Sequence, residues 1–166
     1  LEETAKEIVQ ETQKKFNGLN YLINNVGIAL VDKPIPFQNL NKFDNEFWHK
    51  IMNVNLMSAF YCSKAAAKEL KIKKGSIVNV TSVSSNGKRG TSIPYAVSKG
   101  ALNTLTSSLA KSLSPEVRVN GVSPGFTNTN MTDQRSEYHK RKMANQTLLK
   151  RIAQPEEIAE VIFLLC

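Results

Sequence analysis

The chain has 166 residues and a formal net charge of +8, and its 41% hydrophobic and 22% charged residues are ordinary for a globular domain. About 150 residues can bury a sizeable core, so we predict a single domain over residues 1–166. Two cysteines, Cys62 and Cys166, exclude a disulfide scaffold and have no metal-ligand spacing, and no apolar run reaches the ~20 residues of a membrane span. We therefore expect no metal site and no membrane partner.

Hydrophobic periodicity predicts helices that alternate with strands. In chain order, the predicted elements are a helix at 1–16, a strand at 20–24, a loop at 28–41, a helix at about 42–70, a strand at 76–81, a loop at 82–93, a helix at 94–113, a strand at 117–122, a mobile polar segment at 127–148 and a helix over Pro155–Cys166. Strands that alternate with helices indicate parallel βαβ crossovers and an α/β fold.

The positive charges are scattered along these elements. Lysines stand at the end of the first helix, before the second strand and in the polar segment, without interleaved aromatic residues and without a known nucleic-acid motif. We interpret them as solvated helix faces and expect no nucleic-acid partner.

A serine, a tyrosine and a lysine follow the second predicted strand at a spacing that suits proton transfer. Tyr95 and Lys99 are four residues apart and share a helix face, and Ser82 lies at a strand end, where open α/β sheets present their chemistry. A phenol with a pKa of about 10 is a poor base at neutral pH unless a nearby cation favours the phenolate. Lys99 would supply that cation, and the Ser82 hydroxyl would donate to a substrate carbonyl. This pattern suggests interconversion of a ketone and an alcohol by hydride transfer.

Tyr-x-x-x-Lys alone is a weak signal, because the chain carries a second copy at Tyr138 and Lys142. The position thirteen residues before Tyr138 is Gly125, which has no hydroxyl. We therefore interpret the second copy as a solvated basic helix face. Taken by themselves, Tyr95 and Lys99 would also be interpreted as an ordinary surface tyrosine above a solvated lysine.

Other segments surround the first copy in a fixed order. They are Asn24-Asn25-Val26-Gly27, Val54-Asn55-Leu56, Pro124-Gly125-Phe126-Thr127-Asn128-Thr129 and the helix opening at Arg151–Ala159. Together with Ser82, Tyr95 and Lys99 they resemble the short-chain dehydrogenase/reductase (SDR) family over essentially the whole chain. Val26 replaces the alanine of the family's Asn-Asn-Ala-Gly motif, which adds bulk at a position that we expect to be tight.

The resemblance implies a Rossmann-like, doubly wound parallel sheet, NAD or NADP as cofactor, and a catalytic tetrad of Asn55, Ser82, Tyr95 and Lys99. In this reading Tyr95 is the acid/base, Lys99 lowers the pKa of Tyr95 and holds the nicotinamide ribose, Ser82 polarises the carbonyl, and Asn55 holds a water in the proton relay.

The resemblance also implies a cofactor-binding set. Its members are Asn24, Gly27, Tyr95, Lys99, Pro124, Gly125, Thr127 and Thr129. The Thr127 backbone and the Thr129 side chain would meet the carboxamide, and we expect Asn24 also to tie the sheet together.

The segment at 127–148 takes the place of the family's substrate lid, but Met131 and Tyr138 within it name no ligand. The substrate is therefore a small carbonyl or alcohol of unspecified kind. The resemblance extends to 3-oxoacyl-carrier-protein reductases, sugar dehydrogenases and tropinone-reductase-like enzymes. By the same resemblance, the helices at 42–70 and 94–113 would build a homodimer or homotetramer of the complete protein.

The chain contains no G-x-x-x-G-x-G motif to place a pyrophosphate at a helix N-terminus, and it opens and ends inside predicted helices. We expect an incomplete sheet without its first strands and its last strand, which would leave the strand at 20–24 with an open edge. We expect a cytoplasmic protein, with an upstream targeting peptide left open. The sequence indicates no preference between NAD and NADP.

An alternative from another class stays open at this point. It is a truncated, non-catalytic SDR-like protein that acts through helix-mediated association with partners. The intact tetrad argues against this alternative, and the missing phosphate loop argues for it.

Overall fold

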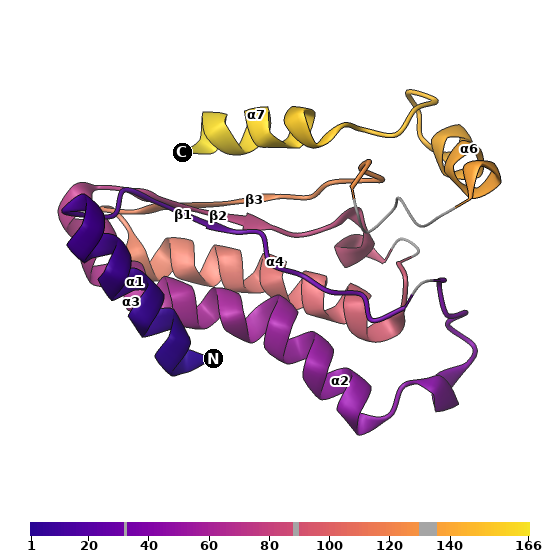
Figure 1. Cartoon of the computed structure of the whole chain (residues 1–166), viewed down its shortest axis with the longest axis horizontal. Coiled ribbons are helices and arrows are strands. Elements are labelled where there is room, and N and C mark those ends of the chain that lie inside the picture. Colours follow the sequence, from indigo (N-terminus) through magenta and orange to yellow (C-terminus); the bar gives the residue numbers. More distant parts are fainter. Residues whose placement is uncertain (32, 88–89, 130–135) are drawn as a thin grey trace.

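The computed structural model describes residues 1–31, 33–87, 90–129 and 136–166 (Figure 1). Its regular elements are α1 (Glu2–Phe16), β1 (Tyr21–Asn24), α2 (Asn45–Met52), α3 (Ser58–Lys73), β2 (Ser76–Val80), α4 (Ile93–Leu113), β3 (Arg118–Val122), α6 (Glu137–Gln146) and α7 (Pro155–Leu165). Two short 3₁₀ turns, η1 (Leu40–Lys42) and η3 (Val83–Asn86), precede α2 and follow β2. The predicted order of helices and strands is confirmed.

Two predicted segments differ in detail. The helix expected at 42–70 is α2 and α3, joined by the π-helical turn η2 (Asn53–Met57) and extended to Lys73. The polar segment at 127–148, expected to be mobile, contains α6, whose N-cap Ser136 accepts a hydrogen bond from the His139 amide. Met131 lies outside the described residues.

The three described strands form a parallel sheet in the order β1-β2-β3. Tyr21 pairs with Ser76, and Ser76 pairs with Arg118. Gly75 allows β2 to begin close to the preceding chain, because a Cβ there would clash with the Asn20 carbonyl. The predicted parallel α/β architecture is confirmed.

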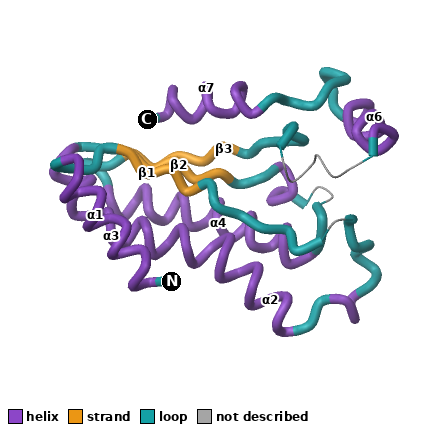
Figure 2. Tube along the Cα trace, viewed as in Figure 1, coloured by secondary structure: helices purple, strands orange, loops and turns teal. Residues whose placement is uncertain are grey.

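Helices cover both faces of this sheet, as a doubly wound fold requires. α1, α3 and α4 lie on one face and α7 lies on the other (Figure 1), and Figure 2 shows the strands between these layers. All five residues of β2 are buried, and the core between α1, α3 and the sheet includes Val9, Leu70 and Ile77.

β1 is an edge strand of the described sheet, as predicted. Its outward side chains Tyr21 and Ile23 are 52% and 44% exposed, whereas β2 is buried along its whole length. The Rossmann-like sheet is therefore incomplete on the β1 side.

Two side-chain amides, of the half-buried Asn24 and the buried Asn79, tie the sheet to two helices. The Asn24 amide donates to Asn79 Oδ1 at 2.8 Å and to Ser63 Oγ on α3 at 3.2 Å. The Asn79 amide donates in turn to Thr106 Oγ1 on α4 at 2.9 Å. Buried amides that find such partners hold elements in one relative placement. The expectation that Asn24 ties the sheet is confirmed.

None of the described helices is long and apolar enough to cross a bilayer.

Candidate active site

The site is built where β2 ends. Ser82 follows this strand as the N-cap of η3, and its Oγ accepts a hydrogen bond from the Ser84 amide at 3.2 Å. The Val83 amide donates to the Pro124 carbonyl at 3.1 Å, which joins this turn to the segment that follows β3. The carboxyl ends of two neighbouring strands therefore meet at Ser82, which is 9% exposed.

α4 brings Tyr95 and Lys99 to this strand end. The helix starts at a Ser92 cap, whose hydroxyl accepts from the Tyr95 amide at 3.2 Å, and Pro94 occupies its first turn. Lys99 Nζ donates to the Val80 carbonyl at 2.9 Å, and the Tyr95 hydroxyl is hydrogen-bonded with Ser82. The three residues singled out in the sequence are therefore brought together.

Burial controls the protonation of both titratable groups. Lys99 is only 4% exposed, and burial lowers its pKa to about 8. Burial also raises the pKa of Tyr95, and the hydrogen bond with Ser82 offsets only part of this rise. Lys99 is not among the groups that shift the pKa of Tyr95, and its ammonium donates to the Val80 carbonyl, so the expectation that Lys99 lowers the pKa of Tyr95 stays a prediction.

Asn55 and Gly27 lie next to Lys99. A Cβ at Gly27 would stand 3.2 Å from Lys99 Nζ and 3.6 Å from Asn55 Oδ1, so a larger residue would crowd the lysine and contact the asparagine. The Asn55 side chain accepts from the Ile28 amide at 2.8 Å and donates to the Ile28 carbonyl and to Ser98 Oγ, both at 3.0 Å. Asn55 thus fastens the loop after β1 to α4, and all four predicted tetrad residues share one region.

Val26 does not occupy a tight place. Its side chain is 68% exposed, so the bulk that replaces the family's alanine points away from the packed interior. The predicted crowding at this position is wrong, because Asn25 and Val26 are exposed and the chain becomes buried again only over Gly27–Ala29.

The segment Pro124–Thr129 borders the same strand end. A Cβ at Gly125 would meet no atom within 4 Å, and Thr127 Oγ1 donates to the Gly125 carbonyl at 3.3 Å. Thr127 forms a parallel bridge with Ala153, closed by the Asn128 amide on the Ala153 carbonyl at 2.8 Å. The chain before α7 therefore holds this segment beside the Ser82 turn, with open space over Gly125.

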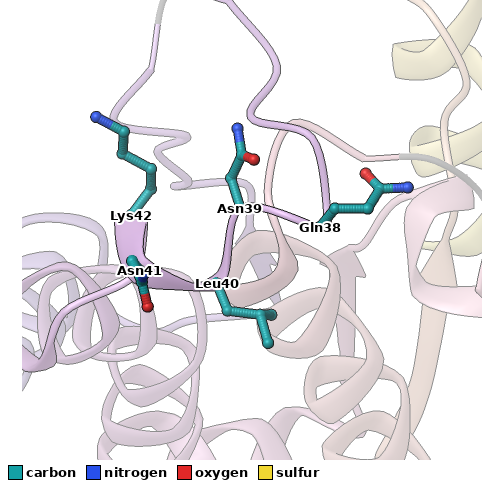
Figure 3. Close-up of a pocket in the computed structure, with 5 residues that line it drawn as sticks. All are labelled: Gln38, Asn39, Leu40, Asn41 and Lys42. Carbon is teal, nitrogen blue, oxygen red and sulfur yellow. The ribbon is translucent and has the colours of Figure 1, made fainter.

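A hollow of about 510 Å³ lies elsewhere, along Gln38–Lys42 ahead of α2. Its five lining side chains point in different directions (Figure 3), and none belongs to the predicted site. A ligand site needs convergent polar groups, so this hollow offers no competing candidate.

Sequence reasoning missed three polar residues around Ser82. Ser84 Oγ accepts from Ser82 Oγ at 3.2 Å, Ser85 Oγ donates to the Ser82 carbonyl at 2.6 Å, and Asn103 Nδ2 donates to Ser85 Oγ at 2.7 Å. Asn103 lies two helical turns after Tyr95, on the same face of α4. That spacing was the available signal.

Comparison with known proteins agrees with this geometry. The family model described as enoyl-(acyl carrier protein) reductase matches residues 1–166. The 3-oxoacyl-[acyl-carrier-protein] reductase FabG of Aquifex aeolicus is 36% identical over 167 residues, which cover 99% of this chain and 65% of that protein.

Two solved structures are similar throughout the chain. A glucose/ribitol dehydrogenase-type SDR of Brucella melitensis superposes with a TM-score of 0.88 at 33% identity, over 99% of this chain and 65% of that one. A gluconate 5-dehydrogenase of Burkholderia cenocepacia, in complex with NADP and tartrate, superposes with a TM-score of 0.87 at 26% identity, over 100% of this chain and 64% of that one.

The chain thus spans about 65% of the length of the relatives that it matches. The family match covers every residue of it, and the strand-end serine, the helical tyrosine and the buried lysine lie together as the motifs predicted. The chain belongs to the short-chain dehydrogenase/reductase family.

Proposed function

We propose that the complete protein is an NAD(P)-dependent oxidoreductase that interconverts a ketone and a secondary alcohol. The observation that carries this proposal is the Tyr95 hydroxyl, hydrogen-bonded with Ser82 at the carboxyl end of β2 and one helical turn from the buried Lys99. A phenol and a serine hydroxyl that meet at one point can serve one carbonyl oxygen.

In the direction of reduction, Ser82 donates a hydrogen bond to the carbonyl oxygen and Tyr95 delivers the proton to it. Because burial raises the pKa of Tyr95, the phenol is protonated at neutral pH and holds the proton that this step transfers. Bound NAD(P)H supplies the hydride to the carbonyl carbon, so the two-electron reduction and the proton together account for the alcohol.

The residues present fit a nicotinamide nucleotide. The Pro124 carbonyl is bonded to the Ser82 turn, and a Cβ at Gly125 would meet no atom within 4 Å, so this segment leaves room beside Ser82 for a bound nicotinamide. By the family pattern, Asn24, Gly27 and Pro124 line the pocket, the Thr127 backbone and the Thr129 side chain hold the carboxamide, and Lys99 holds the ribose. A gluconate dehydrogenase of the same fold contains NADP, which favours this class of cofactor.

Lys99 and Asn55 are assigned the proton supply behind Tyr95. Asn55 Oδ1 and Lys99 Nζ would both lie within 4 Å of a Cβ at Gly27, and this shared neighbourhood supports a joint role of the two residues in the relay. A lysine with a pKa of about 8 exchanges protons with solvent readily near neutral pH.

The substrate in this proposal is a small carbonyl compound or the corresponding alcohol. Proteins similar to this chain are named for 3-oxoacyl, glucose/ribitol and gluconate chemistry, which favours this substrate class. We also propose a cytoplasmic homodimer or homotetramer assembled through α2, α3 and α4, which light scattering on the complete protein would test.

A panel of small ketones tests the proposed activity. The full-length protein should oxidise NADH or NADPH in the presence of ethyl acetoacetate or a keto-sugar, with the loss of absorbance matched by alcohol formation. Cofactor binding without turnover of any ketone in the panel would contradict the proposal and favour the alternative of a non-catalytic SDR-like partner protein.

The buried lysine argues against that alternative. Moving an ammonium out of water costs free energy, and this desolvation lowers the pKa of Lys99. Association through outer helix faces gains nothing from a cation held beneath Gly27, whereas a nucleotide-dependent reaction does.

A further inference from the structure

Three side chains of α4 form hydrogen bonds with the end of β2 and the turn η3. Tyr95, Lys99 and Asn103 follow one another at intervals of four residues and therefore share one face of the helix. Lys99 Nζ donates to the Val80 carbonyl at 2.9 Å, Tyr95 is hydrogen-bonded with Ser82, and Asn103 Nδ2 donates to Ser85 Oγ at 2.7 Å. The first two contacts belong to the proposed reaction centre, and the third lies outside it.

The third contact leads back to Ser82. Ser85 Oγ accepts from Asn103 and donates to the Ser82 carbonyl at 2.6 Å, and the Ser85 amide donates to the same carbonyl at 3.0 Å. The two side-chain hydrogen bonds point in one direction, from Asn103 through Ser85 to Ser82, so each polarises the next. The Ser82 backbone is thereby tied to a helix rather than to its own turn alone.

α4 also comes close to η3 at this level. A Cβ at Gly100 would stand 3.4 Å from the Ser85 carbonyl, an ordinary contact distance, so the helix and the turn are neighbours at this level. The Asn103–Ser85 hydrogen bond opposes movement of the turn away from the helix.

We propose that Asn103 and Ser85 are positioning residues for Ser82, which hold its backbone so that its hydroxyl stays aligned with Tyr95. This inference rests on the proposed function, because the alignment matters for a carbonyl that both hydroxyls serve. A displacement of about 1 Å at a reacting group can cost on the order of 10²-fold in rate. Neither Asn103 nor Ser85 touches the substrate in this account.

The test uses variants of the full-length protein. Asn103→Asp keeps the shape of the side chain but removes its N–H donor, and its carboxylate would draw the Ser85 hydroxyl hydrogen away from the Ser82 carbonyl. Ser85→Ala removes the link altogether, and Ser85→Thr keeps the hydroxyl. Thr104→Ala is the matched control, because Thr104 is the exposed neighbour whose hydroxyl bonds only within α4, to the Gly100 carbonyl at 3.5 Å.

With ethyl acetoacetate and NADPH, we expect kcat per cofactor-binding site to fall about tenfold in Asn103→Asp and in Ser85→Ala. KM and the cofactor Kd should stay within about twofold of the wild-type values. The double variant should be no slower than either single variant, because both substitutions break one chain of hydrogen bonds. Ser85→Thr should recover most of the rate, and Thr104→Ala should match the wild type.

Unchanged kcat in both single variants would overturn the inference, as would additive losses in the double variant. An active-site fraction that falls while kcat per site holds would show a purely structural contact and would also overturn it. Crystal structures supply a readout that does not depend on turnover: the Ser82 hydroxyl should move away from Tyr95 in Asn103→Asp, and an unmoved hydroxyl would refute the role. A wild-type protein without turnover would instead contradict the proposed function.

Discussion

The chain contains the same Tyr-x-x-x-Lys pattern twice, on two helices with different surroundings. On α4, Tyr95 stands against the end of β2 beside Ser82, and Lys99 is 4% exposed. On α6, Tyr138 is 71% exposed and stacks edge-on against the neighbouring His139, with ring centroids 5.7 Å apart. The solvated face predicted for the second copy is confirmed by these exposures.

The difference lies in what faces each pair. A strand end supplies Ser82 and the Val80 carbonyl to the first pair, whereas the residue thirteen positions before Tyr138 is Gly125, in the segment beside the Ser82 turn. The four-residue spacing places two side chains on one helix face, and the packing of that face determines whether they have a shared environment. The following predictions test whether function follows this contrast.

Tyr95→Phe should give the largest effect, a loss of turnover of at least about 10³-fold, because it removes the proton that the carbonyl oxygen receives. Cofactor affinity should stay near the wild-type value, since the ring still fills its place. Steady-state kinetics and cofactor titration of the full-length protein measure both. Tyr138→Phe is the matched control, and a comparable loss in that variant would erase the distinction between the two copies.

Lys99→Ala should lower turnover by about 10²-fold and also weaken cofactor binding by about tenfold, because one ammonium is assigned both roles. Calorimetric titration with NADP or NADPH separates binding from rate. Lys142→Ala removes an exposed lysine and should change neither quantity by more than about twofold. Normal cofactor affinity in Lys99→Ala would rule out the ribose contact.

Ser82→Ala should reduce kcat by about 10²-fold through the loss of one donor to the carbonyl oxygen. Ser108→Ala, which removes a hydroxyl bonded within α4 to the Thr104 carbonyl at 2.9 Å, should leave the rate unchanged. A Ser82→Ala enzyme with full kcat would mean that Tyr95 acts without the serine.

The buried lysine should also make stability depend on pH. Its pKa is about 8 in the folded protein and 10.5 when unperturbed, so between these values the unfolded chain binds a proton that the folded chain lacks. The free energy of unfolding should therefore rise with pH across this window, by up to about 1.4 kcal/mol per unit of pKa separation.

Denaturant unfolding of the wild type, Lys99→Met and Lys142→Met checks this sign. The rise should disappear in Lys99→Met and persist in Lys142→Met. Because the raised pKa values of Cys62 and Tyr95 act in the opposite sense at high pH, the comparison with Lys99→Met isolates the lysine. Equal slopes in all three proteins would contradict the buried-cation account.

Much of the fold follows from local patterns in the sequence. Apolar periodicity predicts the helices and strands, and end signals such as Pro155 at the start of α7 predict where a helix begins. The site at Ser82, Tyr95 and Lys99 was predictable from two signals. The end of a predicted strand gives the place of Ser82, and the four-residue spacing puts Tyr95 and Lys99 on one helix face.

Other features depend on contacts between segments far apart in the chain. In the sequence, Asn79 only interrupts an apolar strand. Its hydrogen bonds with Asn24 and Thr106 show in the structure why an amide stands there. The raised pKa of Tyr95 likewise results from the burial of the phenol, which helical spacing does not reveal. The exposure of Val26 also does not follow from the local sequence pattern.

The most direct test of the central claim is transfer of deuterium from the C4 position of labelled NADPH to the carbonyl carbon of ethyl acetoacetate, followed by mass spectrometry. The full-length wild type and Tyr138→Phe should both yield deuterated alcohol, and Tyr95→Phe should yield almost none. Undiminished label in the product of Tyr95→Phe would contradict the claim that the first Tyr-x-x-x-Lys pair carries the reaction.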